Sequence, residues 1–130
     1  MANYPAELKY AASHEWVRLE GDVAVIGLTA FAMEQLTDLI VMDLAKPGTK
    51  VKQGGRLGEV ESVKSVSDIY APVGGEVTEV NQAIVNDLSK LPADPYGEGW
   101  LVKLKLENAA DLNSLMTADA YQAAVAAADH

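Results

Sequence analysis

Short segments of alternating apolar and polar residues, separated by glycine, run through the first two thirds of this chain. Alternation with a period of two places one face of a strand in a core, and glycine permits the tight turns between strands. The clearest segment is 100–106, whose expected apolar face holds Trp100, Val102, Leu104 and Leu106. The pattern predicts a mainly β fold of short strands.

Further elements follow from the same reading. We expect a helix over 30–36, because the hydroxyl of Thr29 can accept an otherwise unpaired amide hydrogen at its start. Segment 81–90 is ambiguous, and 91–99 is expected to be a loop because it is rich in proline, glycine and aspartate. Besides 100–106, the expected strands are 15–19, 23–28, 39–44, 57–61, 66–70 and 76–80.

The end of the chain changes to a helical period. Leu112, Leu115 and Met116 follow helical spacing, and alanine dominates 121–128. Asn108 and Thr117 are suitable caps for two short helices. We therefore expect one domain over residues 1–130, with a helical tail at about 109–128.

Composition excludes several classes of function. The chain has no cysteine, which removes disulfides, thiolate metal sites and a cysteine nucleophile. Its formal charge of −9 argues against binding to nucleic acid or to an anionic membrane. No segment approaches the roughly 20 apolar residues that a membrane span needs, and the N-terminus lacks a secretory signal. We expect a cytoplasmic protein, or one of the mitochondrial matrix if the source is a eukaryote.

Lys64 falls between the strands expected at 57–61 and 66–70, where a hairpin tip would expose it. Its amine would then be open to an approaching enzyme, as a covalent carrier site requires. A solvated lysine that discourages pairing between sheet edges also fits, and the residues alone favour that simpler interpretation.

Three motifs in order, spread over nearly the whole chain, resemble the glycine cleavage system H-protein family. Residues 61–64 (Glu-Ser-Val-Lys), with 67–69 (Ser-Asp-Ile) and 71–77 (Ala-Pro-Val-Gly-Gly-Glu-Val), are similar to its lipoylation segment. Residues 13–17 (Ser-His-Glu-Trp-Val) and 94–100 (Asp-Pro-Tyr-Gly-Glu-Gly-Trp) are similar to its N-terminal and C-terminal motifs. The chain departs from the family at Thr37, around Ala45-Lys46 and in the segment 83–92.

The resemblance implies a barrel-sandwich hybrid, like other lipoyl and biotinyl carriers, with short flanking helices. It implies a protein with no catalytic residue and no metal site, carrying lipoate as N6-lipoyllysine at Lys64. The arm would take an aminomethyl unit from glycine decarboxylase (P protein) to the folate-dependent aminomethyltransferase (T protein). Dihydrolipoamide dehydrogenase (L protein) would then reoxidise the arm.

The same resemblance assigns roles to residues near Lys64. A lipoate ligase or octanoyltransferase would recognise the attachment motif, in which we include Glu61, Ser62, Val63 and Asp68. The loaded arm would fold into a cleft of the carrier, where hydrogen bonds to its amino group would come from Ser13, Glu15 and Asp68. We expect a monomer that binds neither nucleic acid nor membrane.

Other functions remain open on the sequence. An H-like protein that donates lipoyl groups to other lipoyl domains would carry almost the same motifs. A lipoyl or biotinyl domain of an acyl- or carboxyl-transfer complex would usually be tethered by a linker, which this chain lacks. A hydrolase using Ser13, His14 and Asp68 is disfavoured, because neighbours on a strand point to opposite faces.

Overall fold

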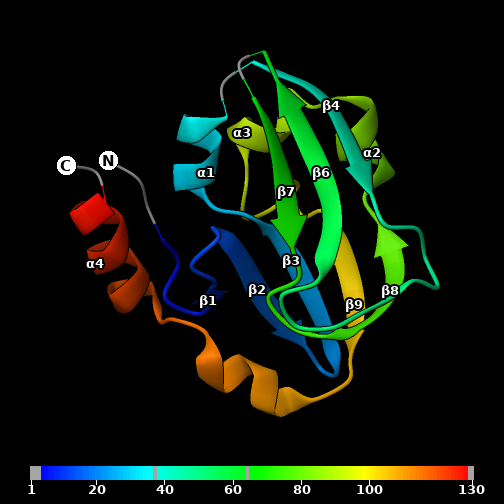
Figure 1. Ribbon diagram of the computed structural model, residues 1–130, viewed down its shortest axis with the longest axis vertical. Helices are drawn as coiled ribbons and strands as arrows, with labels where there is room; N and C mark the ends of the chain where they lie inside the picture. The colour runs from blue at the N-terminus through cyan, green and yellow to red at the C-terminus, as the bar shows by residue number, and fades with distance from the viewer. Residues whose placement is uncertain (1–3, 37, 64, 129–130) are drawn as a thin grey trace.

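The computed structural model describes residues 4–36, 38–63 and 65–128, and its strands form two antiparallel sheets (Figure 1). These sheets confirm the predicted mainly β class. The smaller sheet has the order β4 (Leu39–Leu44), β6 (Arg56–Ser62), β7 (Val66–Tyr70). The larger sheet has the order β1 (Lys9–Tyr10), β2 (Glu15–Glu20), β3 (Val23–Leu28), β9 (Val102–Leu106), β8 (Gly75–Val80), β5 (Lys50–Val51).

Short helices flank the sheets. Helix α1 (Ala30–Gln35) begins as predicted, because the Thr29 hydroxyl accepts the amide hydrogen of Ala32 at 3.3 Å. Between β8 and β9 lie α2 (Gln82–Asn86) and α3 (Lys90–Ala93). The tail forms a 3₁₀ helix, Ala109–Ser114, and then α4 (Ala118–Ala128). Within the described part of the chain, no helix is both long and apolar enough to cross a membrane.

Two sequence-based expectations were wrong in detail. The expected loop 91–99 begins inside α3, which contains Pro92. A proline is tolerated there because amides in the first turn of a helix have no partner within the helix. The expected strand 100–106 begins only at Val102. Leu101, which alternation would put on the face opposite Trp100 and Val102, is fully buried.

Buried apolar side chains form two clusters. The larger lies between the sheets and includes Ile26, Leu57, Ile69 and Leu104. The smaller surrounds Trp16 and packs the tail against the larger sheet through Leu8, Tyr10, Val25, Ala118 and Tyr121. Figure 1 shows α4 beside β1, where this second cluster closes. The tail is therefore attached beside the start of β2, where the sequence motif 13–17 lies.

Trp16 is seated against a glycine of the neighbouring strand. It pairs with Gly27, and its indole nitrogen donates to the carbonyls of Leu28 at 3.1 Å and Pro95 at 3.0 Å. A Cβ atom at Gly27 would lie 2.5 Å from the indole ring. The two carbonyls hold the ring in place, so it cannot easily move away from an added methyl group.

We predict that Gly27→Ala lowers the free energy of unfolding by about 2 kcal/mol or more, because overpacking a rigid site is costly. Urea denaturation measures the loss. The matched control is Gly21→Asn at the β2–β3 turn, where the backbone has a positive φ of 67° and open space surrounds the Cβ position. Asparagine tolerates that conformation, so the control should lose about 1 kcal/mol or less. Equal losses in the two variants would contradict the steric account.

Candidate functional site

The hairpin between β6 and β7 is closed by its own serines. The amide of Ser62 donates to the carbonyl of Ser65 at 2.8 Å, and the Ser65 amide donates to the Ser62 hydroxyl at 3.3 Å. Val63 and Val66 are exposed at this tip. Lys64, the predicted attachment residue, lies outside the described residues, as does Thr37. The structure therefore defines the frame on either side of Lys64.

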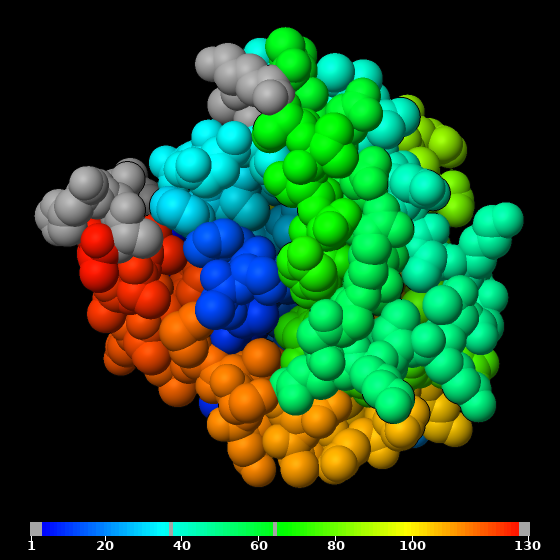
Figure 2. Space-filling view, in the orientation of Figure 1, coloured from blue at the N-terminus to red at the C-terminus, as the bar shows by residue number. Residues whose placement is uncertain are grey.

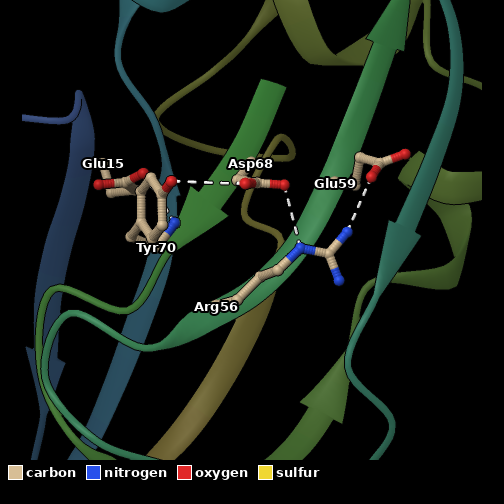
Figure 3. Close-up of polar contacts among 5 residues, drawn as sticks. All are labelled: Glu15, Arg56, Glu59, Asp68 and Tyr70. Carbon is tan, nitrogen blue, oxygen red and sulfur yellow. Dashed lines mark hydrogen bonds and ion pairs between the residues drawn. The ribbon is translucent and has the colours of Figure 1, made fainter. Parts of the chain in front are cut away.

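The outer face of this hairpin carries a pair of carboxylates joined by one arginine (Figure 3). Glu59 and Asp68 are direct partners across β6 and β7, an arrangement in which like charges repel. Arg56 lies between them and donates to Asp68 at 3.0 Å and to Glu59 at 2.8 Å. Asp68 thus has a cationic partner in this structure.

A cavity of about 110 Å³ opens where α1, the residues before β2 and strand β7 meet (Figure 2). We call it the Glu15 cavity. Its polar lining combines Ser13, His14 and Glu15 with Gln35, Ser67 and Asp68. Its apolar lining consists of Leu28, Ala32, Leu36, Val60 and Ile69. The structure therefore brings together Ser13, Glu15 and Asp68, which are the three residues that the resemblance assigned to the arm cleft.

Glu15 is the most unusual group of the cavity, because its carboxylate is almost fully buried. The Ser13 hydroxyl donates to Oε1, and the amide of Tyr70 donates to Oε2 at 3.1 Å. Burial disfavours the charged form and raises the pKa of Glu15 to about 7, although both hydrogen bonds act in the opposite direction. A cation brought into the cavity would therefore stabilise the charged form of Glu15.

Tyr70 connects Glu15 with Asp68. Its backbone amide holds Glu15, and its phenol makes a long 3.4 Å contact to Asp68, as Figure 3 shows. The two carboxylates differ in environment, because Glu15 is buried and Asp68 is exposed. The buried carboxylate forms the inner end of the site, and the arginine-paired carboxylate lies toward solvent.

His14 connects the cavity with the C-terminal helix. Its Nδ1 atom lies 2.6 Å from the hydroxyl of Tyr121, which lies 2.7 Å from the hydroxyl of Thr29. Burial lowers the pKa of His14. His14 has a φ of 78° and lies outside the strand, so the assumption that it alternates with Ser13 along a strand was wrong.

The hydrogen bonds of these residues do not assemble a hydrolytic triad. The Ser13 hydroxyl is engaged by Glu15, His14 by Tyr121, and Asp68 by Arg56. In the described ranges, no group of three or more acidic or histidine side chains is arranged to hold a metal ion. The arrangement is suited to binding an amine through Glu15 beside an apolar wall.

The residues named for attachment-motif recognition have different environments. Ser62 is buried and closes the tip, whereas Val63 is 65% exposed. Glu61 and Asp68 lie on β6 and β7. The sequence did not point to Arg56, although a tip that sets Ser62 opposite Ser65 puts Glu59 opposite Asp68 and calls for a nearby cation. The contribution of the Tyr70 amide carries no side-chain signal in the sequence.

We predict that Glu15→Gln changes how stability depends on pH. Since the folded protein binds the Glu15 proton more tightly than the unfolded chain does, this group's stabilising contribution is lost as pH rises toward and through 7. Glutamine does not titrate, so the variant should gain about 2–3 kcal/mol relative to the unchanged chain between pH 5 and 8.

Urea denaturation at several pH values measures this gain. Glu20→Gln, which removes an exposed carboxylate outside the cavity, is the comparison variant. The same slope in Glu15→Gln and the unchanged chain would show that Glu15 titrates normally.

Comparison with known proteins identifies the family. The profile of the family described as Glycine cleavage H-protein matches residues 8–128. The glycine cleavage system H protein of Symbiobacterium thermophilum is 48% identical over 95% of this chain and 96% of its own. That of Acaryochloris marina is 51% identical over 94% of this chain and 95% of its own.

A solved structure agrees with these sequence matches. The crystal structure of a glycine cleavage system H protein from Mycobacterium marinum matches with a TM-score of 0.88 and 36% identity. The match covers 95% of this chain and 99% of that chain. It confirms the predicted barrel-sandwich fold. The chain belongs to the glycine cleavage H-protein family.

Proposed function

We propose that Lys64 carries lipoate and that Glu15 receives the amine at the end of the loaded arm. The chain is a lipoyl carrier of the glycine cleavage system, as its family membership indicates. The bound lipoyl group supplies a dithiol that the protein's own side chains lack. The assignment of Lys64 is supported by the motif 61–64 and by the exposed frame around the hairpin tip.

The observation that carries the proposal is the buried Glu15 in a cavity beside the hairpin. The apolar lining suits an alkyl arm, and Glu15 suits a protonated amine at its end. Charge-assisted hydrogen bonds are the stronger kind, and they are stronger again away from water. The residues present therefore fit the group that the family implies.

Each polar residue of the cavity has a distinct task in this proposal. Ser13 orients the Glu15 carboxylate through Oε1, and the Tyr70 amide fixes Oε2. Asp68 is positioned by Arg56 at the exposed side and offers a second acceptor. The apolar residues exclude water from the arm, and this shielding is needed if a labile aminomethyl group is to reach the next enzyme.

We also propose the wider role that the family implies. The chain has no activity of its own and works as one lipoyl-carrier domain, as a monomer in the cytoplasm. Its partners are glycine decarboxylase, the aminomethyltransferase and dihydrolipoamide dehydrogenase, with a lipoate ligase or octanoyltransferase to load Lys64. A tethered arm raises the local concentration of its cargo at each of these enzymes.

A role confined to relaying lipoyl groups is less well supported. Relay moves an uncharged acyl chain and gives no task to a buried carboxylate. Burial disfavours the charged form of Glu15, so a glutamate at this buried position is costly on its own. An amine ligand explains why a glutamate stands there. The cavity thus favours glycine cleavage over relay alone.

We predict that Lys64→Arg folds normally but cannot be lipoylated, because a guanidinium does not form the lipoyl amide. Incubation with a lipoate ligase, lipoate and ATP, followed by intact mass and peptide analysis, should show the lipoyl increment only in the unchanged chain. The increment should lie on the peptide that contains residue 64. Glycine decarboxylation that depends on the carrier should be lost with it.

The matched control is Lys52→Arg, at an exposed turn. This variant should be lipoylated and active to the same extent as the unchanged chain. A lipoyl increment on another lysine, or full carrier activity in Lys64→Arg, would overturn the assignment of Lys64.

A further inference from the structure

A second concave site lies on the other side of α1 and has a different chemical character. We call it the Met33 groove; its volume is about 440 Å³. Its polar lining consists of Asp38 and Ser89. Its apolar lining comprises Met33 of α1, Leu36 at the C-terminal cap of α1, Leu39 of β4, Leu88 and Pro92. The groove therefore offers an apolar surface without a buried carboxylate among its lining residues.

The Met33 groove adjoins the hairpin tip. Leu39, which lines it, is the strand partner of Ser62, and the amide of Val63 donates to the carbonyl of Asp38 at 3.2 Å. Position 64 follows Ser62 by two residues, and two residues of extended chain span at most about 7 Å. A lysine side chain lengthened by an octanoyl or lipoyl group is longer than this distance. An arm on residue 64 can therefore reach this groove over the start of β4.

The Glu15 cavity adjoins the same hairpin tip through β7, whereas the Met33 groove adjoins it through β4. Its lining residues Ser67 and Asp68 follow the tip on β7. Leu36 at the end of α1 lines both sites, so α1 separates them. The tip thus stands between two sites, one with a buried carboxylate and one that is mainly apolar.

The end of the arm differs in charge at different stages of its use. A protonated amine is favoured beside Glu15, whereas a dithiolane or an octanoyl end gains only from apolar contact. We propose that the Met33 groove binds the octanoyl or lipoyl chain on Lys64 while the end of that chain is uncharged. This inference rests on the proposed function, because it requires the arm on Lys64.

Packed elements give the groove its shape. Leu88 and Pro92 come from the segment 83–92, which lies between the lipoylation segment and the C-terminal motif. Leu88 is half-buried against the main core, and α3 contacts α1 below the tip (Figure 1). The groove is thus built from two packed helices and the start of β4, which gives it a defined shape.

The test uses the full chain with an octanoyl group on Lys64, compared with the unmodified chain. The octanoyl increment is first located by mass on the peptide containing residue 64. Samples labelled with ¹³C at methionine, leucine and isoleucine methyl groups are then examined by NMR. We expect the methyl resonances of Met33 and Leu39 to shift and to show nuclear Overhauser effects to the octanoyl chain. Met42, buried in β4, serves as the internal reference.

Thermal unfolding provides a second readout. Octanoylation should raise the melting temperature by about 3 °C or more, because the chain buries apolar surface. Leu88→Ser should remove most of this rise in melting temperature. The matched control, Leu19→Ser, changes an exposed leucine of β2 and should retain the rise in melting temperature. Comparing modified and unmodified forms within each variant cancels the effect of the substitution itself.

The outcomes separate this inference from the function on which it rests. An octanoyl increment with effects at Leu28 or Ile69, and none at Met33, would place the uncharged arm in the Glu15 cavity and overturn the inference. An increment with no methyl effects would place the arm in solvent and also overturn it. Failure of a ligase to modify Lys64 at all would contradict the proposed function and remove the basis of both.

Discussion

The hydrogen bond from the Tyr70 amide to Glu15 joins the two sheets of this protein. Glu15 begins β2 of the larger sheet and Tyr70 ends β7 of the smaller one, so the 3.1 Å contact fixes the corner at which the cavity opens. The carboxylate lies inside the protein, which makes it responsive to any cation that enters. The same contact therefore links the two sheets and positions the carboxylate that defines the chemistry of the site.

Local pattern predicts much of this fold, because strands with one buried face alternate and glycines mark their ends. The two-residue strands β1 and β5 were missed, since so short a segment carries no period. The start of β9 was placed too early because Leu101 is buried by tertiary packing rather than by strand alternation. Helix α3 was missed because its proline reads as a loop residue.

The candidate site could be predicted only in part. The resemblance named Ser13, Glu15 and Asp68, and the structure places all three around one cavity. It did not indicate that Arg56 engages Asp68 or that Tyr121 reaches His14 across 107 positions of sequence. Such contacts depend on strand register and on where the tail packs, and neither is written in the local composition. The Met33 groove depends in the same way on the packing of α1 against α3.

The titration of the Glu15 carboxyl group tests the central claim most directly. Carbon-13 NMR can follow this group in the lipoylated protein before and after an aminomethyl unit is loaded onto the arm. An amine held beside Glu15 favours its charged form, so the pKa near 7 in the unloaded protein should fall by about one unit or more on loading. An unchanged pKa, with loading verified by mass, would show that the amine does not reach Glu15 and would contradict the account.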